Sequence, residues 1–171
     1  MAGTAAGSEV VSVERLLAVA KDTMAKARYC WAVTSPGDGQ ANARPMGRIP
    51  SPAGEDPCNV WFMTRRTSRK ALEIGRTGRL TAVFQHDADD SYVTLIATAA
   101  VVTDRAAIRA SWDKAWNTFF PGGAEDENAV FVGAQAERIE LWVRGVTPEP
   151  FGSRGANLVR DASGSWHEVQ R

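Results

Sequence analysis

The chain has 171 residues, of which 44% are hydrophobic, and this fits one soluble globular domain with a real core. Its 20 basic and 20 acidic residues cancel, so bulk charge gives no support for a nucleic-acid-binding protein, which is usually basic. No run approaches the roughly 18 apolar residues of a membrane-spanning helix, so we expect neither a nucleic-acid nor a membrane partner.

A helix and three strands are predicted in the first part of the chain. Ser8 to Ala27 carries apolar residues at helical spacing, and Ser8 and Ser12 are the candidate caps. Runs of β-forming residues predict strands over 29–35, 41–49 and 58–64. Turn residues separate the first two strands, which are therefore expected to pair as a hairpin.

Strands and short helices alternate in the rest of the chain. Helices are predicted over 68–76 and 105–116, and strands over 79–86, 91–103 and 137–146, with a loop at 119–129. Because the strands pair mainly as hairpins and the helices are too few for a doubly wound sheet, the order predicts a mainly β, antiparallel barrel or sheet with flanking helices. We expect one domain over 1–171, with an N-terminal helical segment at 1–28 and a C-terminal extension at 147–171.

Positive charge is concentrated where the third strand meets the short helix, in the segment TRRTSRK (64–70). Ser68 occupies the N-cap or first helical position, and Arg69 and Lys70 follow in the first turn. A helix N-terminus offers free backbone N–H groups and the positive end of the dipole, which suit a phosphate. Cations at that end cost about 0.3–1 kcal/mol unless an anion is bound. The pattern therefore indicates either a phosphate site or a solvated basic turn.

Five segments, taken together, resemble a known family. They are ARPMG (43–47), WFMTRRTSRKALEI (61–74), SYVTLIATAAVVTD (91–104), SWDKAWNTFFPGGAEDE (111–127) and ELW (140–142). In this order they are similar to the pyridoxamine 5′-phosphate oxidase-like proteins, the FMN-binding split-barrel family, and in particular to its general stress protein branch. The resemblance implies a six-stranded antiparallel Greek-key split β-barrel.

The resemblance also implies a cofactor and a partner. The expected cofactor is FMN, with the deazaflavin F420 as the alternative, held at the subunit interface of a homodimer. The resemblance implies that Thr64, Ser68, Arg69 and Lys70 hold the phosphate and that residues near Tyr92 come from the partner subunit. Arg44, Pro45 and Met46 would run along the isoalloxazine and ribityl, with Arg44 as the cation near the pyrimidine edge of the ring. The expected cofactor-binding residues are Arg44, Pro45, Met46, Met63, Thr64, Ser68, Arg69, Lys70, Tyr92 and Trp142. Arg48, on the same strand as Arg44, is a weaker candidate.

The function implied is an FMN-dependent oxidoreductase with an unknown small-molecule substrate. A flavin supplies the redox chemistry itself, so no catalytic side chain is predicted. Tyr92 replaces the glutamine of the oxidases proper, and no Arg-Leu-His-x-Arg segment follows Trp142, so true pyridoxamine-phosphate oxidase activity is not expected. An F420-dependent reductase, a non-catalytic flavin-binding or stress-related protein and, more weakly, a nucleic-acid binder remain alternatives.

The cysteines, histidines and the Trp112/Trp116 pair do not point to a further functional site. Cys30 and Cys58 form no CxxC motif, so no metal site is predicted, and two isolated thiols suit a reducing cytoplasm. His86 and His167 are isolated, and we expect no catalytic triad from them. Trp112 and Trp116 are four residues apart, a spacing more typical of packing than of a cofactor stack.

Overall fold

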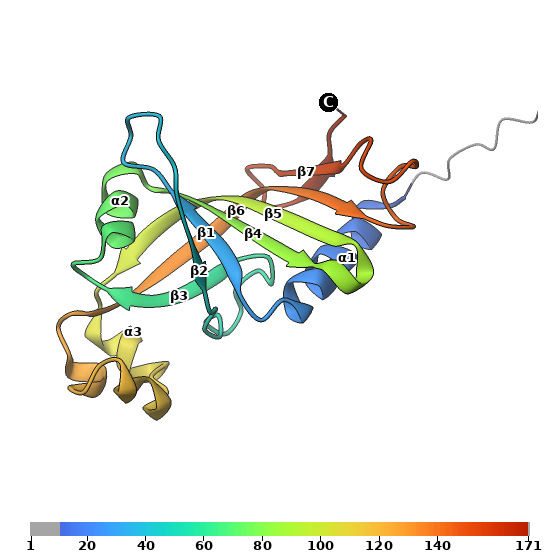
Figure 1. The fold of residues 1–171 in the computed structure, drawn as a ribbon. Coiled ribbons are helices and arrows are strands. Elements are labelled where there is room, and N and C mark those ends of the chain that lie inside the picture. The colour runs from blue at the N-terminus through green and yellow to red at the C-terminus, as the bar shows by residue number, and fades with distance from the viewer. Residues whose placement is uncertain (1–10, 171) are drawn as a thin grey trace, which may run out of the picture.

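The computed structural model describes residues 11–170, which form helices at both ends of a long, twisted antiparallel sheet (Figure 1). The helices are α1 (Val13–Lys26), α2 (Arg69–Thr77) and α3 (Arg105–Ala110), with short 3-10 turns η1 (Asp87–Asp89), η2 (Lys114–Thr118) and η3 (Gly123–Glu125). The strands are β1 (Cys30–Thr34), β2 (Asn42–Met46), β3 (Val60–Arg65), β4 (Arg79–His86), β5 (Ser91–Val102), β6 (Ala129–Val143), β7 (Ala156–Arg160) and β8 (Trp166–Glu168). Among these residues, no helix has the length and apolarity needed to cross a membrane.

The first six strands wrap around one core as a split barrel. Hydrogen-bonded neighbours run in the order β2-β1-β4-β5-β6, and β3 pairs with the first half of β6. Only one bridge, between Ile49 and Trp61, joins the segment after β2 to β3, so the ring is nearly open on that side. The expected mainly β split barrel is confirmed. The described strands number eight rather than six, because β7 and β8 of the C-terminal extension continue the sheet from the second half of β6.

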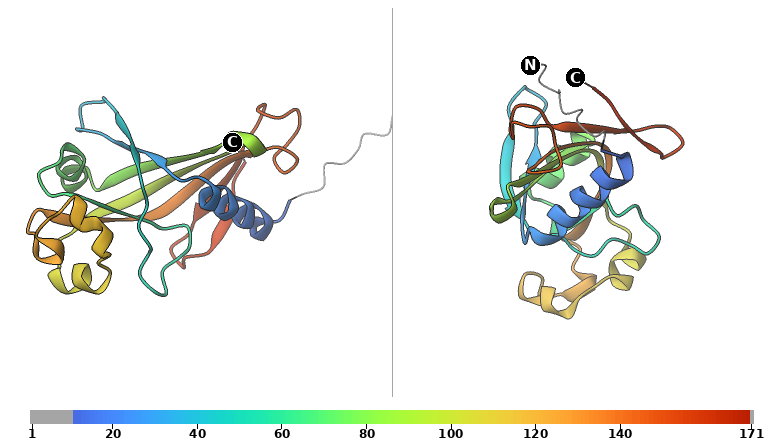
Figure 2. Two further views of the ribbon diagram at one scale, coloured as in Figure 1. Left: turned by 60° about the horizontal axis from the view of Figure 1, so that its bottom comes forward. Right: turned by 90° about the vertical axis from the view of Figure 1, so that its right-hand side faces the viewer.

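Helix α1 packs one face against the sheet. Its buried residues, Leu16, Ala20, Thr23 and Met24, follow the helical period. The Ser12 side chain accepts a hydrogen bond from the Arg15 N–H and caps the helix; Ser8, the other predicted cap, lies outside the described residues. Figures 1 and 2 show α1 and β7 at one end of the sheet, opposite α2 and α3.

Arg48 holds the C-terminal end of α1. Its guanidinium donates to the carbonyl oxygens of Met24 and Ala27 and lies 5.2 Å from the ring centroid of the fully buried Phe84. A cation at a helix C-terminus satisfies carbonyls that lack intrahelical donors. Arg48 therefore has a clear role in the fold.

The predicted start of the last long strand and the predicted end of the helix over 105–116 are both wrong. β6 begins at Ala129 instead of 137. Gly133 interrupts the apolar pattern in the sequence and so hides the first half of the strand. In the structure the ring of Trp61, on the paired strand β3, fills the space beside this glycine, and a Cβ on Gly133 would be 2.8 Å from it. The helix predicted over 105–116 ends at Ala110, because Asp113 caps a new turn by accepting a hydrogen bond from the Ala115 N–H.

The segment from α3 to η3 forms a compact lobe beside the end of β3 (Figure 1). Arg105 anchors it by donating to the carbonyl oxygens of Ala124, Asp126 and Ala129. The lobe therefore lies next to the cationic turn, at the same end of the barrel.

Candidate functional site

The cationic turn lies at the N-terminus of α2, as predicted. Ser68 is the N-cap: its hydroxyl accepts from the Ala71 N–H at 3.3 Å and lies 3.1 Å from the hydroxyl of Thr64. Thr64 is buried at the end of β3. The N–H groups of Arg69 and Lys70, in the first turn, have no intrahelical acceptor. This corner therefore combines hydroxyls, free backbone donors and cations.

The β1–β2 hairpin brings Arg44 to the same corner. Its Nη1 donates to the Thr34 hydroxyl at 2.6 Å and to the Ala32 carbonyl oxygen at 3.4 Å. Its Nη2 is buried and has no hydrogen-bond partner among residues 11–170. Arg44, Thr64 and Lys70 line one narrow space between β2, β3 and α2. Arg44 thus lines this space and keeps a buried nitrogen that makes no hydrogen bond among residues 11–170.

The cations of the corner repel one another. Burial lowers the pKa of Lys70, and the charge of Arg44 acts in the same direction. Burial also lowers the pKa of Arg44, an effect that the carboxylate of Glu73 opposes. Glu73 is 3% exposed, and its oxygens lie 3.8 Å from Arg44 Nη2 and 3.8 Å from Arg69 Nε. The carboxylate of Glu73 thus faces two cations, Arg44 and Arg69, and together with Lys70 they leave the corner with an excess of positive charge.

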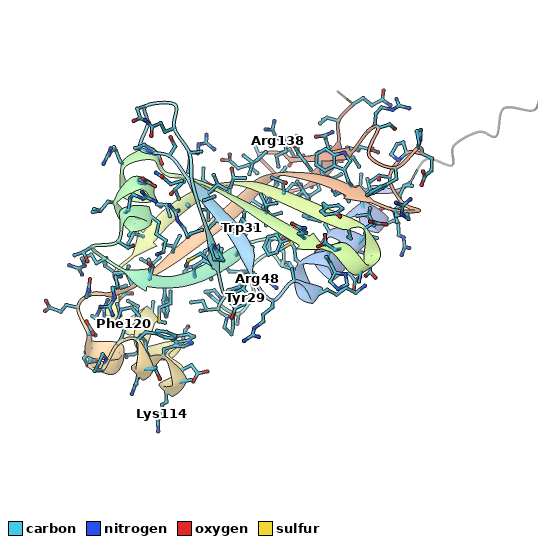
Figure 3. All side chains as sticks on the ribbon, in the orientation of Figure 1. Tyr29, Trp31, Arg48, Lys114, Phe120 and Arg138 are labelled. Carbon is cyan, nitrogen blue, oxygen red and sulfur yellow. The ribbon has the colours of Figure 1, made fainter. Side chains whose placement is uncertain are left out.

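A groove of about 520 Å³ adjoins the corner, within the range of about 300–1,000 Å³ typical of small-molecule sites. Met46, Thr64 and Lys70 line both spaces. The predicted residues Met63 and Ser68 also line the groove, and its aromatic wall consists of Tyr29, Trp116, Phe119 and Phe120. Phe120 lies at the inner side of the lobe in Figure 3.

The aromatic wall was not predicted as part of the site. Arg65 attaches the lobe to the cationic turn, because it donates to the Phe119 carbonyl oxygen at 3.0 Å and stacks 5.2 Å from the Phe120 ring. Trp116 packs edge-on against Trp112, with 5.5 Å between ring centroids, in agreement with the packing role expected from their spacing. The density of aromatic residues in SWDKAWNTFF was the available signal, but pairing the lobe with β3 requires the fold.

Three predicted residues lie away from the groove within one chain. Pro45 is exposed on the opposite face of β2 from Arg44 and Met46. Tyr92 and Trp142 face each other across β5 and β6. Since Thr64 pairs with Val130, Trp142 lies roughly 40 Å further along β6 at about 3.3 Å per residue.

Tyr92 and Trp142 have neighbours of their own at that distant end. The Tyr92 ring lies 6.4 Å from the Phe151 ring, and its hydroxyl donates to Asp87 at 3.2 Å. A Cβ on Gly155 would be 2.7 Å from the Trp142 ring. A role for either residue at the cationic corner would therefore have to come from a second subunit. Arg69 lines neither the narrow space nor the groove; it is solvent-exposed, and its Nε lies 3.8 Å from Glu73 Oε1.

Comparison with known proteins places this geometry in a family. The family model described as "Pyridoxamine 5'-phosphate oxidase like" matches residues 16–148, which include the barrel, the cationic turn and the lobe. No curated protein matches the chain significantly.

Solved structures share the fold. A protein related to general stress protein 26 from Clostridium acetobutylicum has a TM-score of 0.66 and 18% identity, over 78% of this chain and 92% of that chain. A pyridoxamine 5′-phosphate oxidase-related, FMN-binding protein from Nostoc punctiforme has a TM-score of 0.64 and 12% identity, over 96% and 100%. The general stress FMN/FAD-binding protein of Xanthomonas citri has a TM-score of 0.59 and 20% identity, over 75% and 90%. The family match spans most of the chain, which therefore belongs to the pyridoxamine 5′-phosphate oxidase-like family.

Proposed function

We propose that the protein binds FMN, with the terminal phosphate in the cationic corner, and acts as a flavin-dependent oxidoreductase on a small molecule. The observation that carries the proposal is that Arg44, which lines the same space as Lys70, has a buried Nη2 without a hydrogen-bond partner among residues 11–170. A buried cationic donor without an acceptor is costly. A phosphate oxygen would satisfy it.

The donor set of the corner fits a phosphate monoester. Arg44, Arg69 and Lys70 supply three positive charges and Glu73 one negative charge, which leaves a net charge of about +2 beside the N-terminus of α2. A phosphate monoester carries about −1.5 to −2 at pH 7. The hydroxyls of Thr64 and Ser68 and the free N–H groups of the first turn add donors for its oxygens.

The adjoining groove suits the rest of a flavin. Its lining joins apolar side chains, such as Met46 and Met63, to an aromatic wall formed by the lobe and Tyr29, and aromatic rings stack favourably on flat π-systems. The names of the Nostoc and Xanthomonas citri proteins, which state FMN or FMN/FAD binding, support a flavin in this fold. When bound, the flavin supplies the electron-transfer chemistry. The chain's own residues hold the phosphate, orient the ring and exclude water from the groove.

The proposal includes a second copy of the chain. Three large apolar side chains are unusually exposed, two of them at the groove and one on the other face of the β1–β2 hairpin: Tyr29 at 53%, Phe119 at 60% and Trp31 at 49%. Tyr29 and Phe119 line the groove itself, and Trp31 lies on β1 beside Pro45 of β2 (Figure 3). A homodimer would cover these side chains and close the groove. Sedimentation equilibrium tests it, and a strictly monomeric holoprotein would contradict it.

A cytoplasmic location completes the proposal, because both cysteines are free and buried and would remain reduced there. True pyridoxamine-phosphate oxidase activity is not part of it, since no Arg-Leu-His-x-Arg segment follows Trp142.

An absorbance spectrum of freshly purified protein, followed by mass spectrometry of the released ligand, tests the proposal. We expect the visible absorption band of a bound flavin and the mass of FMN. The mass of F420 would instead support a deazaflavin reductase, and bound FMN that no nicotinamide donor reduces would support a flavin-binding protein without turnover.

A paired substitution tests the phosphate corner itself. The double variant Arg69→Ala/Lys70→Ala should be colourless but folded. The matched control is Lys114→Ala/Arg154→Ala, which removes two exposed cations elsewhere. Stoichiometric FMN in the first variant would overturn the assignment.

A further inference from the structure

Glu73 is a buried carboxylate that the proposed phosphate site does not use directly. It lies one turn into α2 and is 3% exposed. Its Oε1 accepts from the Asn42 side-chain amide at 2.7 Å, and its Oε2 accepts from the Thr34 hydroxyl. Asn42 and Thr34 pair with each other across the β1–β2 hairpin. The carboxylate thus ties α2 to the hairpin that carries Arg44.

Thr34 connects the carboxylate to Arg44. The Thr34 hydroxyl donates to Glu73 and accepts from Arg44 Nη1 at 2.6 Å. One arm of the guanidinium is therefore held through a hydrogen-bond chain that ends on a charged group. The other arm, Nη2, has no hydrogen-bond partner among residues 11–170 and lies 3.8 Å from Glu73 Oε2.

This arrangement indicates a role for Glu73 beyond attaching α2 to the hairpin. A carboxylate that served only to neutralise Arg44 would be expected to accept two parallel hydrogen bonds from the guanidinium. Here Glu73 instead accepts hydrogen bonds from two neutral groups. Arg44, which lines the space shared with Thr64 and Lys70, keeps Nη2 without a hydrogen bond among residues 11–170. Holding a donor in place before the ligand arrives reduces the entropy that binding must overcome.

We infer that Glu73 is a positioning residue, which acts through Thr34 to hold the Arg44 guanidinium ready for a phosphate oxygen. This inference rests on the proposed function, because the ligand oxygen is that of the FMN phosphate. Glu73 itself does not contact the ligand.

The ratio of the affinities for FMN and riboflavin tests the inference, because the two ligands differ only in the phosphate. Flavin fluorescence quenching measures both dissociation constants. Glu73→Gln keeps the side-chain shape and removes the charge. We expect it to weaken FMN binding about tenfold and to change riboflavin binding less than about twofold. Glu137→Gln, which removes a carboxylate from the exposed pair with Arg79, is the control and should leave the ratio unchanged.

A double-mutant cycle tests whether Glu73 acts through Arg44. In an Arg44→Met background, Glu73→Gln should cause no further loss of FMN affinity. Thr34→Val, which breaks the hydrogen-bond chain but keeps both charges, should lower the FMN-to-riboflavin ratio as Glu73→Gln does. It also provides the test if Glu73→Gln does not fold.

Several outcomes would overturn the inference. They are an unchanged or raised FMN-to-riboflavin ratio, an equal loss of both affinities, and additive effects in the cycle. If the wild type prefers FMN to riboflavin and the Glu73→Gln variant prefers it equally, only the role of Glu73 is refuted. A wild-type protein that binds neither flavin refutes the proposed function as well.

Discussion

Replacement of Lys70 by methionine shows whether this lysine binds a ligand or stabilises the fold. Lys70 is half-buried, and both burial and the neighbouring charge of Arg44 lower its pKa. The protein without ligand therefore gains nothing from this charge, and Lys70→Met should leave its stability unchanged or raise it by a few tenths of a kcal/mol. A structural lysine would give the opposite result, namely loss of stability.

The same substitution should weaken FMN binding. A hydrogen bond to a charged group contributes about 1.5–3 kcal/mol, and partial exposure of Lys70 favours the lower end because solvent screens the charge. About 1.5 kcal/mol corresponds to roughly a tenfold increase in the FMN dissociation constant. Fluorescence titration measures the affinity, and urea unfolding of the ligand-free protein measures the stability.

Lys114→Met is the matched control, because Lys114 is exposed on the outer side of the lobe in Figure 3. It should change neither quantity. The reasoning is refuted if Lys70→Met binds FMN as tightly as the wild type, or if it clearly lowers the urea midpoint of the ligand-free protein.

Two further predictions concern stability and the thiols. Gly133→Ala should lower the free energy of unfolding, measured in urea, by about 1–3 kcal/mol, because the new Cβ would be 2.8 Å from the Trp61 ring. Gly75→Ala is the control: a Cβ there would have nothing within 4 Å, so this change should be neutral or stabilising. Equal effects of the two substitutions would contradict the packing argument. Burial raises the pKa of Cys30 to about 11 and of Cys58 to about 12, so iodoacetamide at pH 8 should alkylate the native thiols at least about 100-fold more slowly than the unfolded ones. Because these pKa values are higher in the folded state than the usual value of about 8.5, the thiols' contribution to stability is complete below about pH 8.5 and declines above it; native thiols as reactive as unfolded ones would contradict both statements.

The fold was largely predictable because its local signals agree. Alternating apolar residues place β4 at Arg79–His86 as predicted, and Gly78, with φ of 64°, ends α2 in the left-handed conformation that favours glycine. Two predicted boundaries went wrong, one because of a tertiary contact and one because of a local cap. In the sequence Gly133 indicates a break in the strand. In the structure the strand continues through it, and the Trp61 ring across the sheet occupies the space that a side chain would take. Asp113, which reads as a helix residue, stops α3 by capping the next turn.

The cationic corner was predictable because its residues lie close together in sequence and match a family pattern. Ser68 caps α2, as expected. The hairpin brings Arg44 to the cationic corner, whereas the family resemblance implied a place for it along the flavin ring. Glu73 was not predicted, because a carboxylate in a helix normally points to solvent and only the fold buries this one beneath the hairpin. The groove wall was missed for a similar reason, since Phe119 approaches β3 only through the Arg65 contact.

The C-terminal hairpin covers the outer half of β6. β7 pairs with β6 from Arg138 to Leu141, and its Ala156 and Leu158 are buried. Without β7 and β8, the outer half of the longest strand would present unpaired backbone groups beside newly exposed apolar side chains, and such bare edges recruit other chains. A shortened version ending near Thr147 would therefore keep every residue of the cationic corner and still tend to precipitate, so solubility and ligand binding depend on different parts of the chain.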